Sequence, residues 1–303
     1  MEDRAASGLS AGAREFLAGG AGGAAGVVVG QPLDVVRVRL QQPGGARGAG
    51  PGGTAGALAA LVRREGPLAM FKGMSYPLAT TSFQNSVVFW GFGAAMRALR
   101  GPGAEGRGPP GYAEVFAAGC ASGTVQTFIS SPVELLKLKL QLQTQNRGMA
   151  GYVGPLRMAE RIYRARGLRG FAHGFSVTLL RDAPSYGVYF VLYDAIREAV
   201  RPGCRAAGSD GLGNQLFAGG MAGALAWYVA YPADVIKNRY QASFDRYRDP
   251  WDCYRTSVAR EGYGWLGKGL AATLIRAFIG NAAIFSVYEL TMQALERRDA
   301  APA

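Results

Sequence analysis

The most constraining feature of the sequence is a ten-residue segment that occurs three times, at a spacing of about 100 residues. The copies read PLDVVRVRLQ from Pro32, PVELLKLKLQ from Pro132 and PADVIKNRYQ from Pro232. Each copy holds a proline, an acid two residues later, bases five and seven residues later, and a glutamine nine residues later. Self-similarity at a fixed period predicts one body built from three similar units, rather than two unrelated soluble domains.

Composition narrows the class of protein. Hydrophobic residues make up 49% of the chain, charged residues 18%, and the net charge is +12. Such a positive charge indicates a polyanionic partner, either nucleic acid or an anionic lipid surface. The basic, amphipathic stretch 156–169 suits a lipid surface, and the sequence contains no base-stacking module, so we expect no nucleic-acid partner. We find no nucleophile–base arrangement and no metal-ligand spacing, so we expect neither an enzyme nor a cofactor.

Long uncharged windows occupy residues 16–33, 73–96, 115–133 and 211–233. Two further apolar segments, 174–193 and 269–288, are interrupted by Arg181 and Asp182 and by Arg276. A helix needs roughly 20 apolar residues to cross a bilayer. We therefore predict an all-α membrane protein with six transmembrane helices, two in each repeat. The expected divisions are a tail over 1–12 and repeats over 13–105, 110–203 and 211–298. A soluble helical solenoid is the alternative, which these uncharged runs disfavour.

Small residues recur at a spacing of four in the first helix of each repeat. This spacing lets helix backbones approach closely, so it predicts tight packing. The pairs are Gly19/Gly23, Gly22/Gly26, Gly119/Gly123 and Gly219/Gly223.

The repeated prolines close the uncharged runs, and proline inside a helix removes a hydrogen bond and bends the helix. Beyond each proline, an acid and a base three residues apart share one helix face. They form either local solvated pairs or a ring between helices. Ionisable groups at membrane depth usually face an interior and pair with each other, which favours a ring that acts as a gate. The predicted ring pairs are Asp34 with Lys137, Glu134 with Lys237, and Asp234 with Arg37, braced by Gln41, Gln141 and Gln241.

With these motifs the chain resembles the mitochondrial carrier family over nearly its whole length. The signature Pro-x-acid-x-x-base-x-base occurs three times, and Glu65-Gly66 and Phe71-Lys72-Gly73 follow its first copy. The resemblance implies a pseudo-threefold bundle of six helices in the mitochondrial inner membrane. It also implies a monomer, associated with the anionic lipid cardiolipin, that works by alternating access between a matrix gate and a cytosolic gate.

Some family positions differ in this sequence. The family's cytosolic motif, aromatic-acid-x-x-base, is complete at Tyr193-Asp194-x-x-Arg197, but Met292 replaces the base after Tyr288-Glu289. The copy at Phe92 lacks both charges, so the resemblance implies a weak cytosolic gate. In the second repeat Arg166 replaces an acid and His173 replaces a base, and we expect this histidine at the surface.

Three residues lie at equivalent positions of the repeats, seven residues after Gly73, Gly174 and Gly269. They are Thr80, Arg181 and Arg276. The resemblance places them at one depth as substrate contacts, with Gln84 and Asn85 one turn beyond Thr80. Adjacent Arg181 and Asp182 suit an amino acid, because a carboxylate prefers a bidentate arginine and an ammonium prefers a carboxylate. The alternative is that these charges neutralise neighbours on other helices.

The segment RDAPSYGVYF resembles the plant mitochondrial basic amino acid carriers, which implies exchange of arginine, ornithine and lysine, with citrulline and histidine as further candidates. Ornithine carriers have an acid at the position of Gln84, so the grip on the side-chain cation would fall to Gln84, Asn85 and Asp182. A carnitine-type carrier remains open, with Trp227, Tyr228 and Tyr231 as an aromatic cage. A non-transporting scaffold on the same fold also remains open.

Overall fold

The computed structural model describes residues 11–44, 53–101, 108–145, 151–207 and 212–300, and within these ranges it contains helices and no strand. The all-α prediction is therefore confirmed for the described residues. Each repeat holds two long helices. They are α1 (Ala11–Gln41) and α4 (Ser75–Arg100), α5 (Tyr112–Leu142) and α7 (Phe175–Val200), and α9 (Leu212–Ala242) and α11 (Leu270–Ala300).

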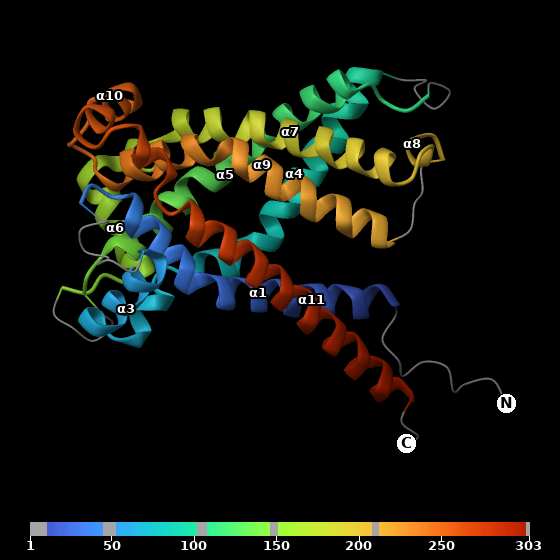
Figure 1. Ribbon diagram of the computed structural model, residues 1–303, viewed down its shortest axis with the longest axis horizontal. Helices are drawn as coiled ribbons and strands as arrows, with labels where there is room; N and C mark the ends of the chain where they lie inside the picture. Colours follow the sequence, from blue (N-terminus) through green and yellow to red (C-terminus); the bar gives the residue numbers. More distant parts are fainter. Residues whose placement is uncertain (1–10, 45–52, 102–107, 146–150, 208–211, 301–303) are drawn as a thin grey trace.

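Short helices separate the long ones. Each repeat places one α-helix and one 3-10 helix after its first long helix, and α8 (Cys204–Ala207) follows α7. These pairs are α3 (Gly53–Glu65) with η1 (Pro67–Phe71), α6 (Pro155–Arg166) with η3 (Gly167–Gly170), and α10 (Pro250–Glu261) with η4 (Tyr263–Gly267). Helices α3, α6 and α10 lie at one end of the molecule, and α8 lies at the other (Figure 1). We call these the α3/α6/α10 end and the α8 end.

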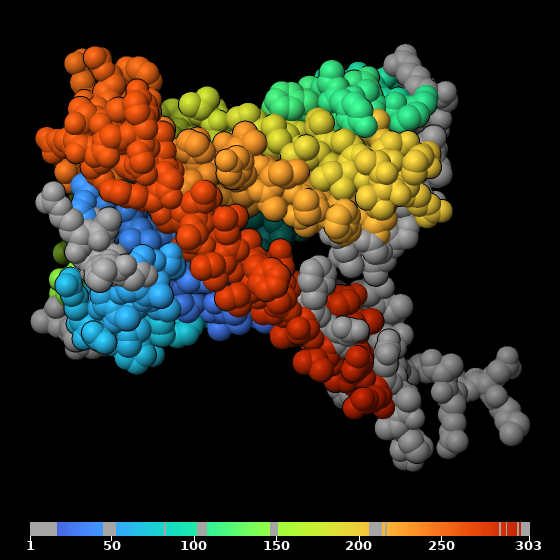
Figure 2. Space-filling model, in the orientation of Figure 1, coloured from blue at the N-terminus to red at the C-terminus, as the bar shows by residue number. Residues whose placement is uncertain are grey.

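The long helices run between the two ends, but they do not stay equally close. Toward the α8 end, α11 diverges from α9, which is plain in both the ribbon and the space-filling views (Figures 1 and 2). Pro32, Pro132 and Pro232 lie inside the continuous helices α1, α5 and α9. The chain thus carries the charged segment that follows each proline as part of the same helix.

The glycine pairs divide into packed and unpacked positions. A Cβ added at Gly22 would lie 2.7 Å from the backbone oxygen of Ile284 in α11, and one at Gly119 would lie 2.7 Å from Gly187 in α7. Close packing is therefore found at Gly22/Gly26 and Gly119/Gly123. A Cβ at Gly19 or Gly23 would meet nothing within 4 Å, so that part of the prediction is wrong. α11 approaches α1 over the neighbouring pair of glycines instead.

At Gly219 and Gly223 a Cβ would meet only tyrosine side-chain atoms, at 3.9 Å. This pair has ordinary contacts with side chains of α7 and makes no close backbone approach. The prediction of tight packing at these two glycines is also wrong.

Replacing Gly123 with alanine should lower the thermal midpoint by about 5 °C, because a new Cβ would lie 2.8 Å from the Asp182 backbone oxygen and force α5 and α7 apart. The matched control is Gly23→Ala at the equivalent position of the first repeat, which has open space around it. Thermal unfolding in detergent compares the two variants. Equal midpoints would show that α5 and α7 do not pack this closely.

Lipid-like surroundings are indicated by exposed apolar side chains on the long helices, including Phe83, Trp90 and Phe278 at 60%, 64% and 79% exposure. Among the described residues, one helical stretch, Tyr263–Leu295, is long and apolar enough by itself to cross a membrane. Charged side chains such as Arg181 interrupt the apolar run of α7, and glycines lower the hydropathy of α1.

Candidate functional site: a ring of charges beside a cavity

Three ion pairs join the helices that carry the repeated motif. Lys137 of α5 donates to Asp34 of α1 at 2.9 Å, Arg37 of α1 pairs with Asp234 of α9, and Lys237 of α9 pairs with Glu134 of α5. The ring pairing predicted from the sequence is present, and each pair joins two repeats instead of forming within one helix.

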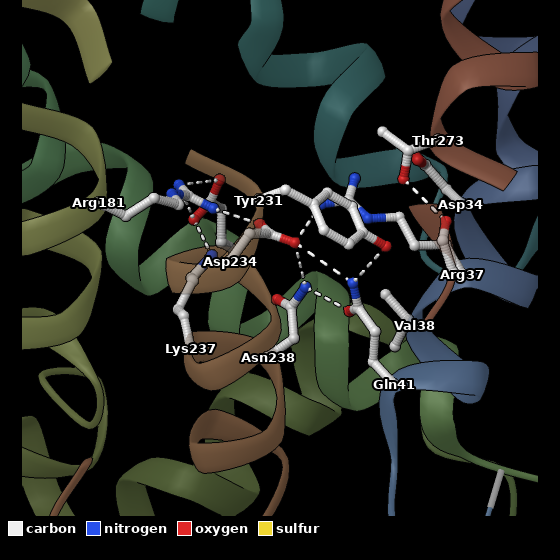
Figure 3. Close-up of polar contacts among 12 residues, drawn as sticks. Asp34, Arg37, Val38, Gln41, Arg181, Tyr231, Asp234, Lys237, Asn238 and Thr273 are labelled. Atoms are coloured by element: carbon white, nitrogen blue, oxygen red, sulfur yellow. Dashed lines mark hydrogen bonds and ion pairs between the residues drawn. The ribbon is translucent and has the colours of Figure 1, made fainter. Parts of the chain in front are cut away.

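Two arginines of the second helices also enter the ring. Arg276 of α11 lies 2.7 Å from Asp34, and Arg181 of α7 lies 2.9 Å from Asp234 and 3.0 Å from Glu134. Figure 3 shows Arg181 approaching Asp234 from one side while Arg37 and Gln41 approach it from the other. One acid of α7, Asp182, completes the cluster by accepting from Arg181 Nε at 2.7 Å.

Arg181 and Arg276, which were predicted as substrate contacts, thus lie against the acids of the ring. In this conformation both neutralise acids of other helices, which for Arg181 was the alternative interpretation. The physical reason is that a buried guanidinium without a partner is costly, and both side chains are long enough to reach the ring acids. The functional side chains therefore form one cluster, with four carboxylates and five cations. They are Asp34, Glu134, Asp182 and Asp234, with Arg37, Lys137, Arg181, Lys237 and Arg276.

The predicted glutamine braces behave differently in the three repeats. Gln41 lies beside the ring and donates to Tyr231 Oη at 3.3 Å and to Asp234 Oδ2 at 3.5 Å. Gln241 donates instead to the His173 carbonyl at 3.3 Å, and the buried Nε2 of Gln141 has no hydrogen-bond partner. The brace prediction is wrong for Gln141 and Gln241.

The reason lies in the glycines that precede the second long helices. Gln141 and Gln241 pack against Gly73 and Gly174, which adopt φ of 76° and 82° and have no side chain to exclude them. Another residue, Asn238, takes up the bracing role by donating to Asp234 Oδ2 at 2.9 Å and to Gln41 Oε1 at 2.8 Å. The signal for it was available, since the other repeats carry Val38 and Leu138 at this register.

A cavity of about 310 Å³ adjoins the ring between α4, α5, α7 and α9. Its polar lining includes three predicted substrate residues, Gln84, Arg181 and Asp182. The sequence did not single out the other polar side chains, because serines and glutamines are common on helices that pack closely. These are Gln126, Ser130 and Ser185.

The remaining predicted substrate residues do not line this cavity. Thr80 donates to the Tyr76 carbonyl of its own helix at 2.8 Å, and Asn85 is exposed. Arg276 lies at a smaller void of about 200 Å³ inside the ring. Gln84 lines the cavity, whereas Asn85, the next residue of α4, does not. Thr80 and Asn85 do not line the cavity in this conformation, and their role as substrate contacts stays a prediction.

Comparison with known proteins decides the family. The family model described as "Mitochondrial carrier protein" matches three successive blocks, residues 10–102, 108–202 and 208–299. The chain belongs to the mitochondrial carrier family. It is thus a multi-pass transport protein of the mitochondrial inner membrane and not an enzyme.

Curated relatives cover nearly the whole carrier. It is 40% identical over 295 residues to the mitochondrial arginine transporter BAC2 of Arabidopsis thaliana, covering 95% of this chain and 94% of the relative. It is 39% identical over 294 residues to the human mitochondrial basic amino acids transporter, covering 96% and 93%. It is also 37% identical over 303 residues to human solute carrier family 25 member 48, covering 93% and 95%.

Two repeats of the carrier hold their α3/α6/α10 end together with a carboxylate between two bases. Glu65 accepts from Arg39 at 2.9 Å and from Lys72 at 2.6 Å. Glu261 accepts from Arg239 at 2.6 Å and also pairs with Lys268. Burial raises the pKa of the Glu65 carboxyl, but hydrogen bonds from its two bases outweigh this and hold the pKa below its ordinary value of 4.5.

The second repeat replaces this arrangement with an aromatic one. Lys139 donates to the Ala242 carbonyl at 2.7 Å, and its ammonium lies 4.0 Å from the ring centroid of Phe244. His173 stacks on Tyr240 at 4.5 Å and is half-buried, so the prediction of a surface histidine is wrong. Cation–π and stacking contacts thus substitute for the missing acid.

Changing Glu65 to glutamine should lower the thermal midpoint by a few degrees at pH 7, and the difference from the native chain should vanish as the pH falls. Because the folded pKa lies below the unfolded value, the carboxylate stabilises the fold above pH 4.5 and loses this contribution as acid protonates it. Thermal unfolding in detergent between pH 7 and about 3 measures the effect. Glu160→Gln, which removes an exposed pair with Arg164, is the control, and a pH-independent Glu65→Gln difference would contradict the argument.

At the α8 end Asp194, the acid of the complete cytosolic motif, pairs with bases of its own repeat. Asp194 lies 3.9 Å from Arg197 on the same helix and 3.3 Å from Arg205 of α8. Arg205 was not singled out from the sequence, because it lies outside the repeated motifs. Tyr288 lies on α11 near Gly22, whereas the side chain of Glu289 falls outside the described part of the structure.

Proposed function

We propose that this carrier exchanges basic amino acids, namely arginine, ornithine and lysine, across the mitochondrial inner membrane. The observation that carries the proposal is the pairing of Arg181 and Asp182 on the wall of the cavity. A free amino acid needs a cation for its carboxylate and an anion for its ammonium, and this pair offers both. Relatives named as arginine and basic amino acid transporters support the same substrate class.

Transport proceeds by alternating access, with the charged ring as the matrix gate. A substrate carboxylate that binds Arg181 takes the place of an acid that this guanidinium now holds, such as Glu134 or Asp234. Each acid released from Arg181 weakens the connection between α5, α7 and α9. Substrate therefore binds the loosened ring more tightly than the closed one, which is the condition for shifting the equilibrium between them. An empty carrier keeps the ring closed, so exchange is faster than net uptake.

The six long helices cross the membrane, and the α8 end faces the intermembrane space. Helices of 26 to 31 residues extend roughly 40–45 Å, which exceeds the hydrocarbon thickness of about 30 Å. The carrier works as a monomer, with repeats over residues 13–105, 110–203 and 211–298 after a tail over 1–12. Cardiolipin binds at the basic α3/α6/α10 end, and nucleic acid is not a partner.

Carnitine is the weaker candidate substrate. A cage for its quaternary ammonium needs free aromatic faces, but Arg37 already lies 4.9 Å from the Trp227 ring centroid. Tyr228 is 66% exposed, and Tyr231 is buried and donates to the Lys268 carbonyl at 2.8 Å. A non-transporting scaffold would not need the complete ring of three interhelical pairs.

Uptake of labelled arginine into proteoliposomes tests the proposal. The vesicles are preloaded with arginine, ornithine, carnitine or buffer. Rapid uptake with internal arginine or ornithine, lost in Asp182→Asn, supports a basic amino acid exchanger. Stimulation by carnitine alone would move the assignment to a carnitine carrier. Absence of exchange with every internal solute would favour the scaffold.

A further inference from the structure

Glu134 differs from the other two ring acids in its surroundings. Its side chain is 32% exposed, compared with 9% for Asp34 and 2% for Asp234. It lines both the void inside the ring and the larger cavity beside it, whereas Asp34 and Asp234 line only the void. Glutamate is one methylene longer than the aspartates of the other repeats. This added length carries a gate carboxylate to the wall of the substrate cavity.

The charged lining of the cavity consists of Arg181, Asp182 and Glu134, which is one cation and two anions. A dibasic amino acid at neutral pH carries one carboxylate and two cations, so the two sets match group by group. With the substrate carboxylate on Arg181 and its α-ammonium on Asp182, Glu134 is left for the side-chain cation. A desolvated cation without an anion is costly, so the site needs such a partner.

The other residue at hand for this task is Gln84 of α4, which lines the same cavity but is neutral. The spacing between the two carboxylates also suits one small molecule. Both touch a single guanidinium, since Arg181 lies 2.7 Å from Asp182 and 3.0 Å from Glu134. The two carboxylates are therefore separated by about the width of one planar group, a span that a dibasic amino acid can bridge.

We infer that Glu134 binds the side-chain cation of the substrate and so links substrate charge to gate opening. The inference rests on the proposed function. In the closed ring the partner of Glu134 on α9 is Lys237. A substrate guanidinium or ammonium competes with Lys237 for this carboxylate. It thereby weakens the ion pair that connects α5 to α9. A neutral side chain leaves the Glu134–Lys237 pair intact, so dibasic substrates open the ring more readily than neutral ones.

The test uses Glu134→Asp, which keeps the charge but shortens its reach by one methylene. Aspartate already serves in the ring, where Asp34 lies 2.9 Å from Lys137. The measured quantity is the preference for arginine over citrulline, its uncharged analogue. Unlabelled citrulline or unlabelled arginine is added until uptake of labelled arginine is halved. The preference is the citrulline concentration that achieves this divided by the arginine concentration that does so. We expect the preference to fall about tenfold, as loss of one charged contact predicts.

A second variant separates ligand binding from gate geometry. Adding Gln84→Glu to Glu134→Asp places an acid on the part of the cavity wall that α4 forms, without altering any other ring residue. We expect it to restore the preference for arginine. The shift of thermal midpoint in detergent by arginine and by citrulline gives the same comparison for any variant whose uptake is slow.

The outcomes distinguish this inference from the function on which it rests. If the native chain does not exchange arginine, the proposed function itself is wrong. If the native chain exchanges arginine and Glu134→Asp keeps the native preference, the role of Glu134 is refuted. A lowered preference that Gln84→Glu does not restore also refutes it, because a purely structural role in the ring cannot be replaced from α4.

Discussion

Replacing Arg181 with alanine should reduce arginine exchange at least a hundredfold. The guanidinium contacts Asp182, Glu134 and Asp234 on three helices, so the variant leaves three carboxylates, two of them buried, short of a cation. Breaking a buried ion pair by removing one partner costs about 3–5 kcal/mol. The same change removes the group that would receive the substrate carboxylate. Transport and stability should therefore fall together.

Exchange in proteoliposomes and thermal unfolding in detergent measure the two effects. Arg181→Lys should recover part of the stability but little of the transport, because a single ammonium cannot contact three carboxylates in the planar geometry of a guanidinium. Arg164→Ala removes a side chain that is 78% exposed, and it should behave as the native protein does. Native exchange rates in Arg181→Ala would disprove the assigned site.

The largest loss of stability without loss of the substrate site is expected from Arg239→Ala. Arg239 is 1% exposed and donates to Glu261 at 2.6 Å and to the Gln41 carbonyl at 2.9 Å. Its guanidinium also lies 4.4 Å from the ring centroid of the fully buried Trp265. Removing it costs about 3–5 kcal/mol in lost packing and pairing, which lowers the thermal midpoint by about 10 °C.

Lys139→Ala is the matched control, since Lys139 occupies the same register in the second repeat. Lys139 donates to one backbone carbonyl and lies over the face of Phe244, instead of pairing with a carboxylate held between two bases. We expect its midpoint to fall by no more than about a third as much. Equal decreases of the thermal midpoint in the two variants would mean that the ion pair of Arg239 with the Glu261 carboxylate adds no stability.

The threefold register predicted the ring well because every partner is repeated. Once three acids and three bases occupy equivalent positions on three helices, one pair between two helices implies the other two by symmetry. Asp34 with Lys137 is an example. Arg181 and Arg276 were recognised as functional, but not as members of this ring. Their reach depends on how closely α7 and α11 approach, and that distance is set by contacts such as Gly123 against Asp182.

Where the repeats differ locally, the assumption that equivalent residues behave alike gave wrong predictions. Gln41 braces Asp234, but Gln241 turns toward His173 because Gly174 leaves room for it. Asn238 was missed for the converse reason, since its counterparts in the other repeats are apolar. A position that breaks a repeat is as informative as one that keeps it. Asn85 lies outside the cavity, which its spacing along the chain did not reveal.

The packing of α1 against α11 has a consequence for how the protein is made. Gly22 and Gly26 of α1, the first helix, pack against Ile284 of α11, the last helix. Asp34 of α1 also pairs with Arg276 of α11. During synthesis the face of α1 that packs on α11 therefore has no partner until the last helix has been made. A chain cut short before α11 would present an uncovered glycine face and an acid that lacks one of its partners. The bundle therefore cannot close until the last helix is in place beside the first.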